Sequence, residues 1–275
     1  MSKGVLVDLS KCIGCGSCTV ACKMYNQNQW IEDRSPTCGA QATLADQNWT
    51  VIKSFEVEKD GKPVWRFVKE QCLHCREPAC ASACFAKAFQ KTPEGPVVYY
   101  PSLCVGCRYC MVACPFSVPK YEWEKPLPYV TKCMMCASRV TNGQAPACVS
   151  VCPTHVMTFG DRDALLEQAK TIIANNPGYV QHIYGEKEVG GTEWIYISDV
   201  PFEKLGFKTG LTEKPLPSYT STFMTYTPIF GGAWAVVLGG IALFTHRKDK
   251  VASKEKSESD PAPRKTIEPD ERRPS

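Results

Sequence analysis

Four short tracts of cysteines are the part of this chain whose residue types and spacing could do chemistry. In the tract Cys104–Pro115 the cysteines follow the pattern C-x2-C-x2-C-x3-C, and a proline comes next. The first three thiolates can converge on one site, while the fourth lies one helical turn later and points towards a neighbouring site. This spacing is typical of cysteines that bind [4Fe–4S] clusters, so it predicts electron transfer.

The other three tracts keep the same steps with small changes. Residues 12–22 repeat the spacing, residues 72–84 have two extra residues before the third cysteine, and residues 133–152 have eleven residues between the second and third. The sixteen predicted ligands are Cys12, Cys15, Cys18, Cys22, Cys72, Cys75, Cys80, Cys84, Cys104, Cys107, Cys110, Cys114, Cys133, Cys136, Cys148 and Cys152. Sixteen thiolates are enough for four cubane clusters.

Structural zinc is the alternative for these tracts, because C-x2-C pairs also serve zinc and sixteen thiolates would fill four tetrahedral sites. Three cysteines within seven residues, followed by a fourth, are more crowded than zinc pairs on separate knuckles, which favours iron–sulfur clusters. Cys38, the seventeenth cysteine, has no neighbouring thiol, and we interpret it as a loop residue outside the sites.

Nothing in the sequence predicts a catalytic site. His155, His182 and His246 are scattered and have no arrangement that would activate a nucleophile. His74 stands between two predicted ligands and could hydrogen-bond to a cluster sulfur and tune its potential. The net charge of +4, with no run of Lys or Arg before residue 247, gives little support for nucleic-acid binding.

The elements that must hold the tracts repeat along the chain. Runs of β-favouring residues, at 5–7 and 97–100, each lead into a ligand loop and a short helix, which indicates duplicated ferredoxin units. Gly14 and Gly16 let the backbone wrap around the sulfurs. Within an insertion at residues 23–71, two β-favouring runs around Asp60-Gly61 predict a hairpin.

After the last tract, the sequence predicts a helix that begins with Asp161 as its N-cap and ends before Pro177-Gly178. Its apolar face, expected to pack on the cluster domain, consists of Leu165, Leu166, Ala169, Ile172 and Ile173. A strand at 194–197 and an irregular connector at 206–217 follow.

No charged residue occurs from Pro215 to Thr245, so a single transmembrane helix is predicted in preference to a buried helix of a soluble domain. The basic residues from Arg247 on should stay in the cytoplasm, which would put the cluster domain on the outer, periplasmic side of a bacterial or archaeal membrane. Because the N-terminus lacks an export signal, the domain is expected to be exported with a partner. Gly231-Gly232 and Gly239-Gly240 offer surfaces for another membrane helix.

The predicted fold class is α+β: two ferredoxin-like modules, each with two [4Fe–4S] clusters, an inserted β-hairpin and a C-terminal transmembrane helix. The expected parts are a four-cluster domain at 1–160, an extension at 161–221, the transmembrane helix at 222–246 and a disordered cytoplasmic tail at 247–275.

From Val5 to Phe244, the chain resembles the iron–sulfur β subunit of membrane-bound molybdopterin oxidoreductases and hydrogenases. Residues 46–51 (DQNWTV), the single anchor and the missing leader resemble the respiratory formate dehydrogenase β subunit. Residues 107–121, 184–192 and 200–205 are at least as similar to the hydrogenase-2 type iron–sulfur subunit, which usually carries a twin-arginine leader. The absence of a leader here favours formate dehydrogenase.

The resemblance, together with the ferredoxin rule that fourth ligands are exchanged between tracts, implies four ligand sets. The outer sets are Cys12, Cys15, Cys18 with Cys152, and Cys133, Cys136, Cys148 with Cys22; the inner sets are Cys72, Cys75, Cys80 with Cys114, and Cys104, Cys107, Cys110 with Cys84.

The resemblance also implies a non-catalytic role in anaerobic respiration. The four clusters would carry electrons between a catalytic molybdopterin subunit that oxidises formate and an integral cytochrome b subunit that reacts with quinone. A membrane-bound nickel–iron hydrogenase is the alternative partner, and a zinc-stabilised membrane adaptor without redox activity is the alternative from another class.

Overall fold

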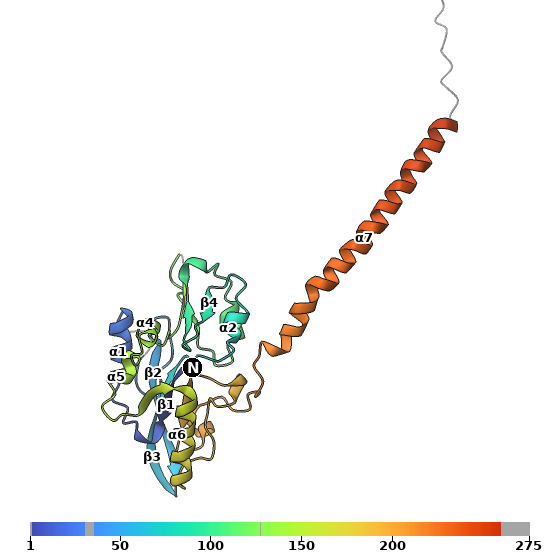
Figure 1. Cartoon of the computed structure of the whole chain (residues 1–275). Coiled ribbons are helices and arrows are strands. Elements are labelled where there is room, and N and C mark those ends of the chain that lie inside the picture. Colours follow the sequence, from blue (N-terminus) through green and yellow to red (C-terminus); the bar gives the residue numbers. More distant parts are fainter. Residues whose placement is uncertain (1, 31–35, 127, 260–275) are drawn as a thin grey trace, which may run out of the picture. The chain divides into compact units, whose positions relative to one another are not determined.

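The computed structural model describes residues 2–30, 36–126 and 128–259 and forms two compact units, Met1–Tyr219 and Thr220–Ser275 (Figure 1). The strands are β1 (Lys3–Asp8), β2 (Thr50–Lys59), β3 (Lys62–Gln71), β4 (Phe89–Lys91), β5 (Val97–Tyr99), β6 (Lys120–Tyr121), β7 (Val130–Thr131), β8 (Met157–Asp161) and β9 (Trp194–Ile197). The α-helices are α1 (Ser17–Asn26), α2 (Ala79–Ser82), α3 (Tyr109–Ala113), α4 (Ala137–Thr141), α5 (Ala147–Ser150), α6 (Arg162–Asn175) and α7 (Ser218–Ser259). Short 3-10 helices are η1 (Leu9–Lys11), η2 (Pro101–Leu103), η3 (Glu188–Gly190) and η4 (Phe202–Leu205).

A three-stranded sheet in the order β8-β1-β9 joins the two ends of the first unit. Its central strand, β1, pairs antiparallel with β8 and parallel with β9. Because side chains alternate along a strand, Val5 and Val7 belong to the main core, whereas Leu6 packs with α6 on the opposite face. Residues beyond 160 therefore share one sheet with the N-terminus, although a boundary was expected there.

The hairpin predicted in the insertion is confirmed. Strands β2 and β3 pair in register from Thr50↔Gln71 to Lys59↔Lys62. Asp60 and Gly61 form the two-residue turn, and both have positive φ, as a type I′ turn requires. The predicted strands at the start of the chain and before Cys104 are also present, as β1 and β5.

Helix α6 buries the apolar face expected from its sequence: Leu165, Leu166, Ala169 and Ile173 pack against β1 and β9, and Ile172 is partly buried beside them. Asp161 does occupy the N-cap position, but its side chain does not cap the helix. It accepts a hydrogen bond from Lys3 Nζ at 2.7 Å instead, because the β1–β8 register places these two residues opposite each other.

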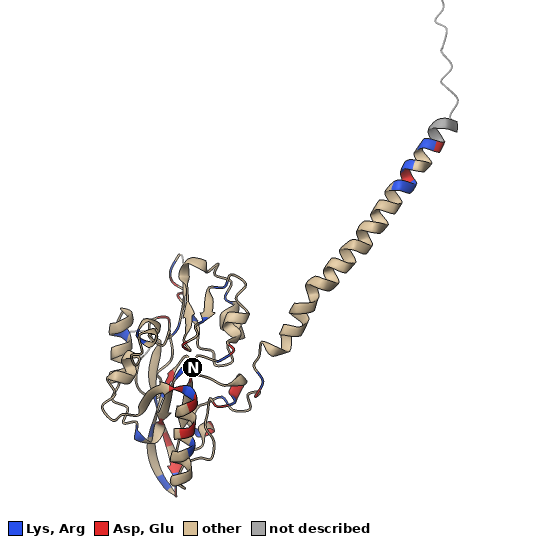
Figure 2. Ribbon diagram, in the orientation of Figure 1, with Lys and Arg blue, Asp and Glu red and all other residues tan. Residues whose placement is uncertain are grey.

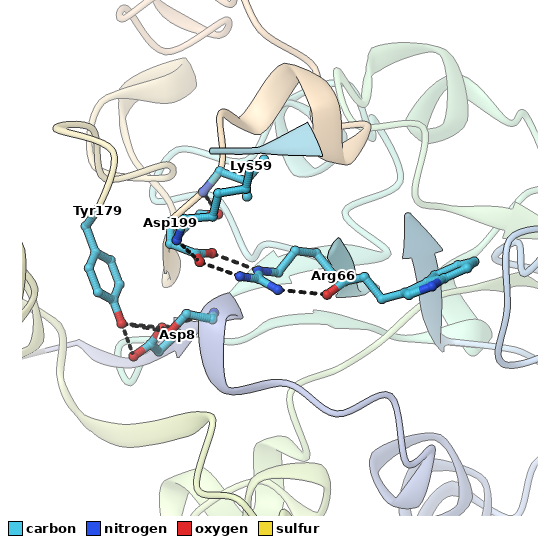
Figure 3. A network of polar contacts seen from close by, with 9 residues as sticks. Asp8, Lys59, Arg66, Tyr179 and Asp199 are labelled. Carbon is cyan, nitrogen blue, oxygen red and sulfur yellow. Dashed lines mark hydrogen bonds and ion pairs between the residues drawn. The ribbon is translucent and has the colours of Figure 1, made fainter. Parts of the chain in front are cut away.

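Ion pairs anchor the hairpin to the chain after β9. Arg66 donates to both carboxylate oxygens of Asp199, and Lys59 Nζ donates to Asp199 Oδ2 at 2.6 Å (Figure 3). In the same view, the Tyr179 hydroxyl donates to the Asp8 carboxylate at about 3 Å and so holds the segment after α6 against the end of β1. These contacts hold the hairpin and β1 in place. The first cysteine tract follows β1 directly and packs beside the hairpin.

The second unit is the long helix α7, whose described side chains are all exposed. Charged residues are confined to its C-terminal part, where Lys and Arg gather (Figure 2). By its length and composition, the helix can cross a membrane.

Helix α7 is longer than the sequence predicts. It continues to Ser259 through residues 247–259, where a disordered tail is expected. This stretch contains good helix formers such as Ala, Lys and Glu and neither Gly nor Pro, so nothing in it ends the helix. The predicted tail from residue 260 on lies outside the described residues.

Candidate iron–sulfur sites

Cysteines of the first and last tracts line two cavities in the first unit. One cavity is lined by Cys12, Cys15, Cys18 and Cys152, and the other by Cys22, Cys133, Cys136 and Cys148. These two groups have the same members as the outer ligand sets expected from the sequence. Cys38 lines neither cavity; its sulfur lies beside Gly16, where a Cβ would approach it to 2.9 Å.

The register of the central sheet explains why the two ends of the domain meet at one cavity. Val7 of β1 pairs with Met157 of β8 in an antiparallel ladder. Cys12 follows Val7 by five residues, and Cys152 precedes Met157 by five residues. In an antiparallel pair both continuations leave the ladder at the same end, so the two cysteines reach the same place.

The inner tracts repeat this construction on a smaller ladder. Phe89 of β4 pairs antiparallel with Tyr99 of β5. Cys84 precedes Phe89 by five residues, and Cys104 follows Tyr99 by five residues. Both cysteines are packed against the same core cluster. The β1–β8 and β4–β5 ladders are therefore built alike. In each, the first cysteine of one tract meets the last cysteine of another, so the internal repeat predicted from the sequence includes this contact between tracts.

The inner cysteines also lie close enough to influence one another. Burial raises the pKa of Cys110 to about 12, and the thiols of Cys104, Cys107 and Cys84 add to the rise. Burial likewise raises the pKa of Cys75, with further contributions from Cys72, Cys114 and Cys80. Each of these two groups matches an inner ligand set. Thiols with such raised pKa values are protonated at neutral pH, so metal binding must displace their protons.

A left-handed backbone position recurs immediately before the second cysteine of every tract. These positions are Gly14 (φ +71°), His74 (φ +52°), Gly106 (φ +72°) and Met135 (φ +54°). Glycine adopts this conformation freely, whereas a residue with a side chain pays roughly 1–2 kcal/mol. His74 and Met135 are almost completely buried, so packing offsets the strain. The sequence analysis foresaw this role for Gly14, but not the equivalent roles of Gly106, His74 and Met135.

This turn aims backbone N–H groups at the first cysteine of the tract. The Gly106 amide donates to Cys104 Sγ at 3.4 Å, and the Met135 amide donates to Cys133 Sγ at 3.3 Å. In the first tract, the Gly14 amide hydrogen bond lowers the pKa of Cys12, although burial has the larger effect and raises it. Hydrogen bonds to ligand sulfur favour the thiolate and raise a cluster's reduction potential.

Comparison with known proteins agrees with this reading of the cysteines. Two models of the 4Fe-4S dicluster domain match residues 11–88 and 63–162. A protein of Nitratidesulfovibrio vulgaris strain Hildenborough is 44% identical over 264 residues, which is 94% of this chain and 70% of that protein.

Three similar relatives have names that refer to hydrogenase or formate dehydrogenase. The hydrogenase-2 operon protein HybA of Escherichia coli O157:H7 is 34% identical over 236 residues, 74% of this chain and 72% of the relative. The formate dehydrogenase iron–sulfur subunit of Haemophilus influenzae is 34% identical over 246 residues, 86% of this chain and 77% of the relative. The nitrate-inducible formate dehydrogenase iron–sulfur subunit of Escherichia coli K12 is 38% identical over 201 residues, 70% of this chain and 66% of the relative.

The chain belongs to the family of formate dehydrogenase and hydrogenase iron–sulfur subunits. With two dicluster domains and sixteen tract cysteines, this iron–sulfur subunit binds four [4Fe–4S] clusters and transfers electrons through them.

The residues around the cavities fit such clusters. Trp194 lines the cavity of Cys22 and Cys133, and its buried Nε1 has no hydrogen-bond partner in the described residues. A cluster sulfur would supply the acceptor that this N–H lacks. The two matching dicluster models, rather than any feature of the cavities, favour [4Fe–4S] clusters over the zinc alternative.

His74 is held in one orientation in this iron–sulfur subunit. It is fully buried, and its Nδ1 accepts a hydrogen bond from the Val97 amide at 2.8 Å. Burial lowers its pKa, and the charges of Lys132, Lys91 and Lys69 lower it further. The neutral ring therefore carries its proton on Nε2, which has no partner in the described part of the chain. Donation from Nε2 to a cluster sulfur stays a prediction.

Two buried lysines beside the sites escaped the sequence analysis. Lys69 and Lys132 are each only 3% exposed. Lys132 Nζ donates to the carbonyl oxygens of Val97 and Cys133. Both lysines sit three residues or fewer before a ligand cysteine, but single lysines near cysteines carry no recognisable sequence pattern. Only their burial distinguishes them from surface lysines.

Proposed function

We propose that this chain carries electrons through four [4Fe–4S] clusters between a molybdopterin formate dehydrogenase subunit and a quinone-reactive cytochrome b subunit in the membrane. The observation that carries the proposal is the conjunction of four cysteine groups in one compact unit with one helix, among the described residues, that is long enough to cross a membrane. The named formate dehydrogenase relatives, at up to 38% identity, support the formate partner. The chain itself would be non-catalytic.

The ligand sets proposed for the four clusters are the two outer and two inner quartets described above. Shared cavities support the outer quartets, and the mutual effects of the thiols on their pKa values support the inner ones. Placing Cys152 with the first tract has a sharp test. In Cys152→Ser, the spectroscopic signal of the first-tract cluster should change, while the cluster at Cys133 keeps its signal. A change at the Cys133 cluster instead would contradict this assignment.

The proposed orientation places the cluster-bearing unit on the outer face of the cytoplasmic membrane. Arg247, Lys248 and Lys250 follow the apolar part of α7, and basic residues next to a transmembrane helix are retained on the cytoplasmic side. Labelling of intact spheroplasts with an impermeant amine or thiol reagent tests this orientation. Labelling of the first unit without permeabilisation supports it, and protection of the first unit contradicts it.

A nickel–iron hydrogenase partner is the second candidate, because HybA aligns with 74% of the chain at 34% identity. Isolation of the membrane complex through a tag on this chain separates the two. A molybdenum- or tungsten-containing partner and formate-dependent dye reduction support the formate dehydrogenase proposal. A nickel-containing partner and hydrogen-dependent dye reduction overturn it in favour of hydrogenase.

A further inference from the structure

Lys69 lies between the two outer cluster sites. It lines the cavity of Cys12, Cys15, Cys18 and Cys152, and it lines the cavity of Cys22, Cys133, Cys136 and Cys148. No other residue in the described part of the chain is common to the linings of these two cavities. Any charge on its ammonium group therefore acts on both sites.

The position of this ammonium group is fixed by neighbouring side chains. Lys69 Nζ donates to Gln71 Oε1 at 2.9 Å and lies 4.5 Å from the centre of the Trp194 ring. Gln71 is itself held by donation from its Nε2 to the Tyr196 hydroxyl at 2.6 Å. The amide oxygen and the aromatic face are both favourable neighbours for a cation.

A buried ammonium needs negative charge nearby, yet within the described residues no carboxylate lies at ion-pair distance from Lys69. The surrounding negative groups are cysteines. The cavities that Lys69 lines contain Cys12, Cys15, Cys18 and Cys152 on one side and Cys22, Cys133, Cys136 and Cys148 on the other, whose thiolates would carry negative charge once clusters are bound. These thiolates belong to both outer quartets, so the lysine and the two ligand sets stabilise one another's charges.

We propose that Lys69 is a shared electrostatic positioning residue, whose fixed positive charge raises the reduction potential of both outer clusters. The proposal rests on the outer ligand sets proposed above. Each cluster gains one electron on reduction and no bond forms or breaks, so the added negative charge is stabilised by the nearby ammonium. In a buried, low-dielectric site this stabilisation is large and little screened by salt.

Sharing one charge has a consequence for electron transfer between the two outer clusters. An electron that moves from one cluster to the other stays beside the same ammonium group, so Lys69 shifts both potentials in the same direction. Its charge makes reduction of either outer cluster more favourable, but it changes the difference between their two potentials little. Electron transfer between the two clusters is therefore not made much less favourable.

The test uses the complete complex, purified through a tag on this chain, and redox titrations followed by electron paramagnetic resonance. In Lys69→Met, the equilibrium constant for reduction of both outer clusters should fall at least about tenfold, which is a negative shift of 59 mV for one electron. The two inner clusters should keep their potentials. Lys69→Arg retains the charge and should restore both outer potentials most of the way.

Two further variants complete the experiment. Lys170→Met removes an exposed lysine on α6 and should shift no cluster. Gln71→Glu keeps Lys69 but places a carboxylate against its Nζ, so both outer potentials should fall. This second variant decides the matter if iron analysis shows that Lys69→Met assembles fewer than four clusters. Unchanged outer potentials in the variant that retains four clusters, or a shift of one outer cluster alone, overturn the proposal.

Failure of this inference is distinguishable from failure of the proposed ligand sets. The outer signals are identified independently through Cys152→Ser and Cys148→Ser. If these variants alter the expected signals but Lys69→Met does not move them, only the role of Lys69 is wrong. If the cysteine variants alter other signals, the ligand sets themselves are wrong. Neither outcome depends on whether the catalytic partner uses formate or hydrogen.

Discussion

Trp194 shows how one side chain can complete a site whose metal ligands come from elsewhere. Its ring is fully buried, packs beside Lys69 Nζ, and lines only the cavity of the Cys22 and Cys133 group. An indole N–H is a donor only, and this one has no acceptor among the described residues. Lys69 adjoins both outer cavities, whereas Trp194 adjoins one.

We therefore expect Trp194→Phe to lower the potential of a single cluster, because the ring volume is largely kept while the N–H donor is lost. The cluster at Cys133 should become harder to reduce by roughly twofold to tenfold in its equilibrium constant, and the other three should be unaffected. Redox titration measures this difference. Trp65→Phe, at an exposed position of β3, is the matched control and should leave all four potentials unchanged.

At the scale of structural elements, each ligand loop contains a residue in the left-handed conformation. In the first loop this residue, Gly14, also lies close to the hairpin. A Cβ added at Gly14 would lie 2.5 Å from the ring of Phe67 on β3, and the backbone there has φ +71°. Gly143, in the turn after α4, has the same φ of +71° but no atom within 4 Å of a Cβ. A comparison of alanine variants at Gly14 and Gly143 thus separates the cost of backbone strain, which both share, from the cost of a clash with Phe67, which only Gly14 has.

Gly143→Ala should cost about 1–2 kcal/mol of stability and leave four clusters, because only the backbone is strained. Gly14→Ala should cost more and reduce the iron content, since the first ligand loop must move away from the hairpin. Thermal unfolding and iron analysis of both variants measure the difference. Equal effects of the two substitutions would show that the hairpin does not constrain this loop.

The ion pairs of Asp199 give the hairpin a pH-dependent attachment. Burial would raise the pKa of Asp199, but hydrogen bonds and charges from Arg66 and Lys59 lower it to about 2. An unfolded aspartate titrates near 3.9, so these contacts stabilise the folded state above about pH 4 and lose that contribution as the pH falls towards 2.

Asp199→Asn should therefore be about 1 kcal/mol less stable than the wild type at pH 7, with allowance for solvent screening. The difference between the two proteins should shrink between pH 5 and pH 3, as the wild-type carboxylate begins to lose its advantage. Denaturant unfolding at several pH values measures it. Asp163→Asn, at a carboxylate that is 79% exposed, should show no such pH-dependent difference.

At the scale of the whole molecule, the chain divides into a compact unit with all sixteen tract cysteines and a helix whose described side chains are exposed. An apolar helix with no buried side chain requires a lipid or protein environment. The first unit has its own sheet, hairpin and core clusters, so we expect it to fold without residues of the helix.

Deletion of residues 218–275 should consequently release the chain from membranes while its four clusters remain. Fractionation after carbonate extraction, combined with iron and sulfide analysis, measures both properties. The full-length chain, treated in the same way, should stay in the membrane pellet. A truncated chain that stays in the pellet, or that loses its clusters, would contradict the division into an anchor and a cluster-bearing unit.

The sequence by itself determined that the chain binds iron–sulfur clusters, because cluster ligands are recognised by their local spacing. The x2 and x3 steps, the strands before Cys12 and Cys104 and the Asp60-Gly61 turn are all set by residues close together in the chain, and the structure agrees with these local predictions. The uncharged stretch likewise predicted the long helix, although its C-terminal end was placed too early because lysine-rich segments can be either helical or disordered.

The resemblance led us to expect which cysteines share a site, but only the tertiary structure gives the physical reason that distant groups meet. Cys12 and Cys152 line one cavity because the β1–β8 register brings them there, and a register between distant strands is fixed by core packing. Left-handed His74 and Met135 are tolerated because burial offsets their strain. Lys69, one lysine among many in the sequence, gains its place between two cluster sites because strand β3 carries it into the core, where a charge acts strongly.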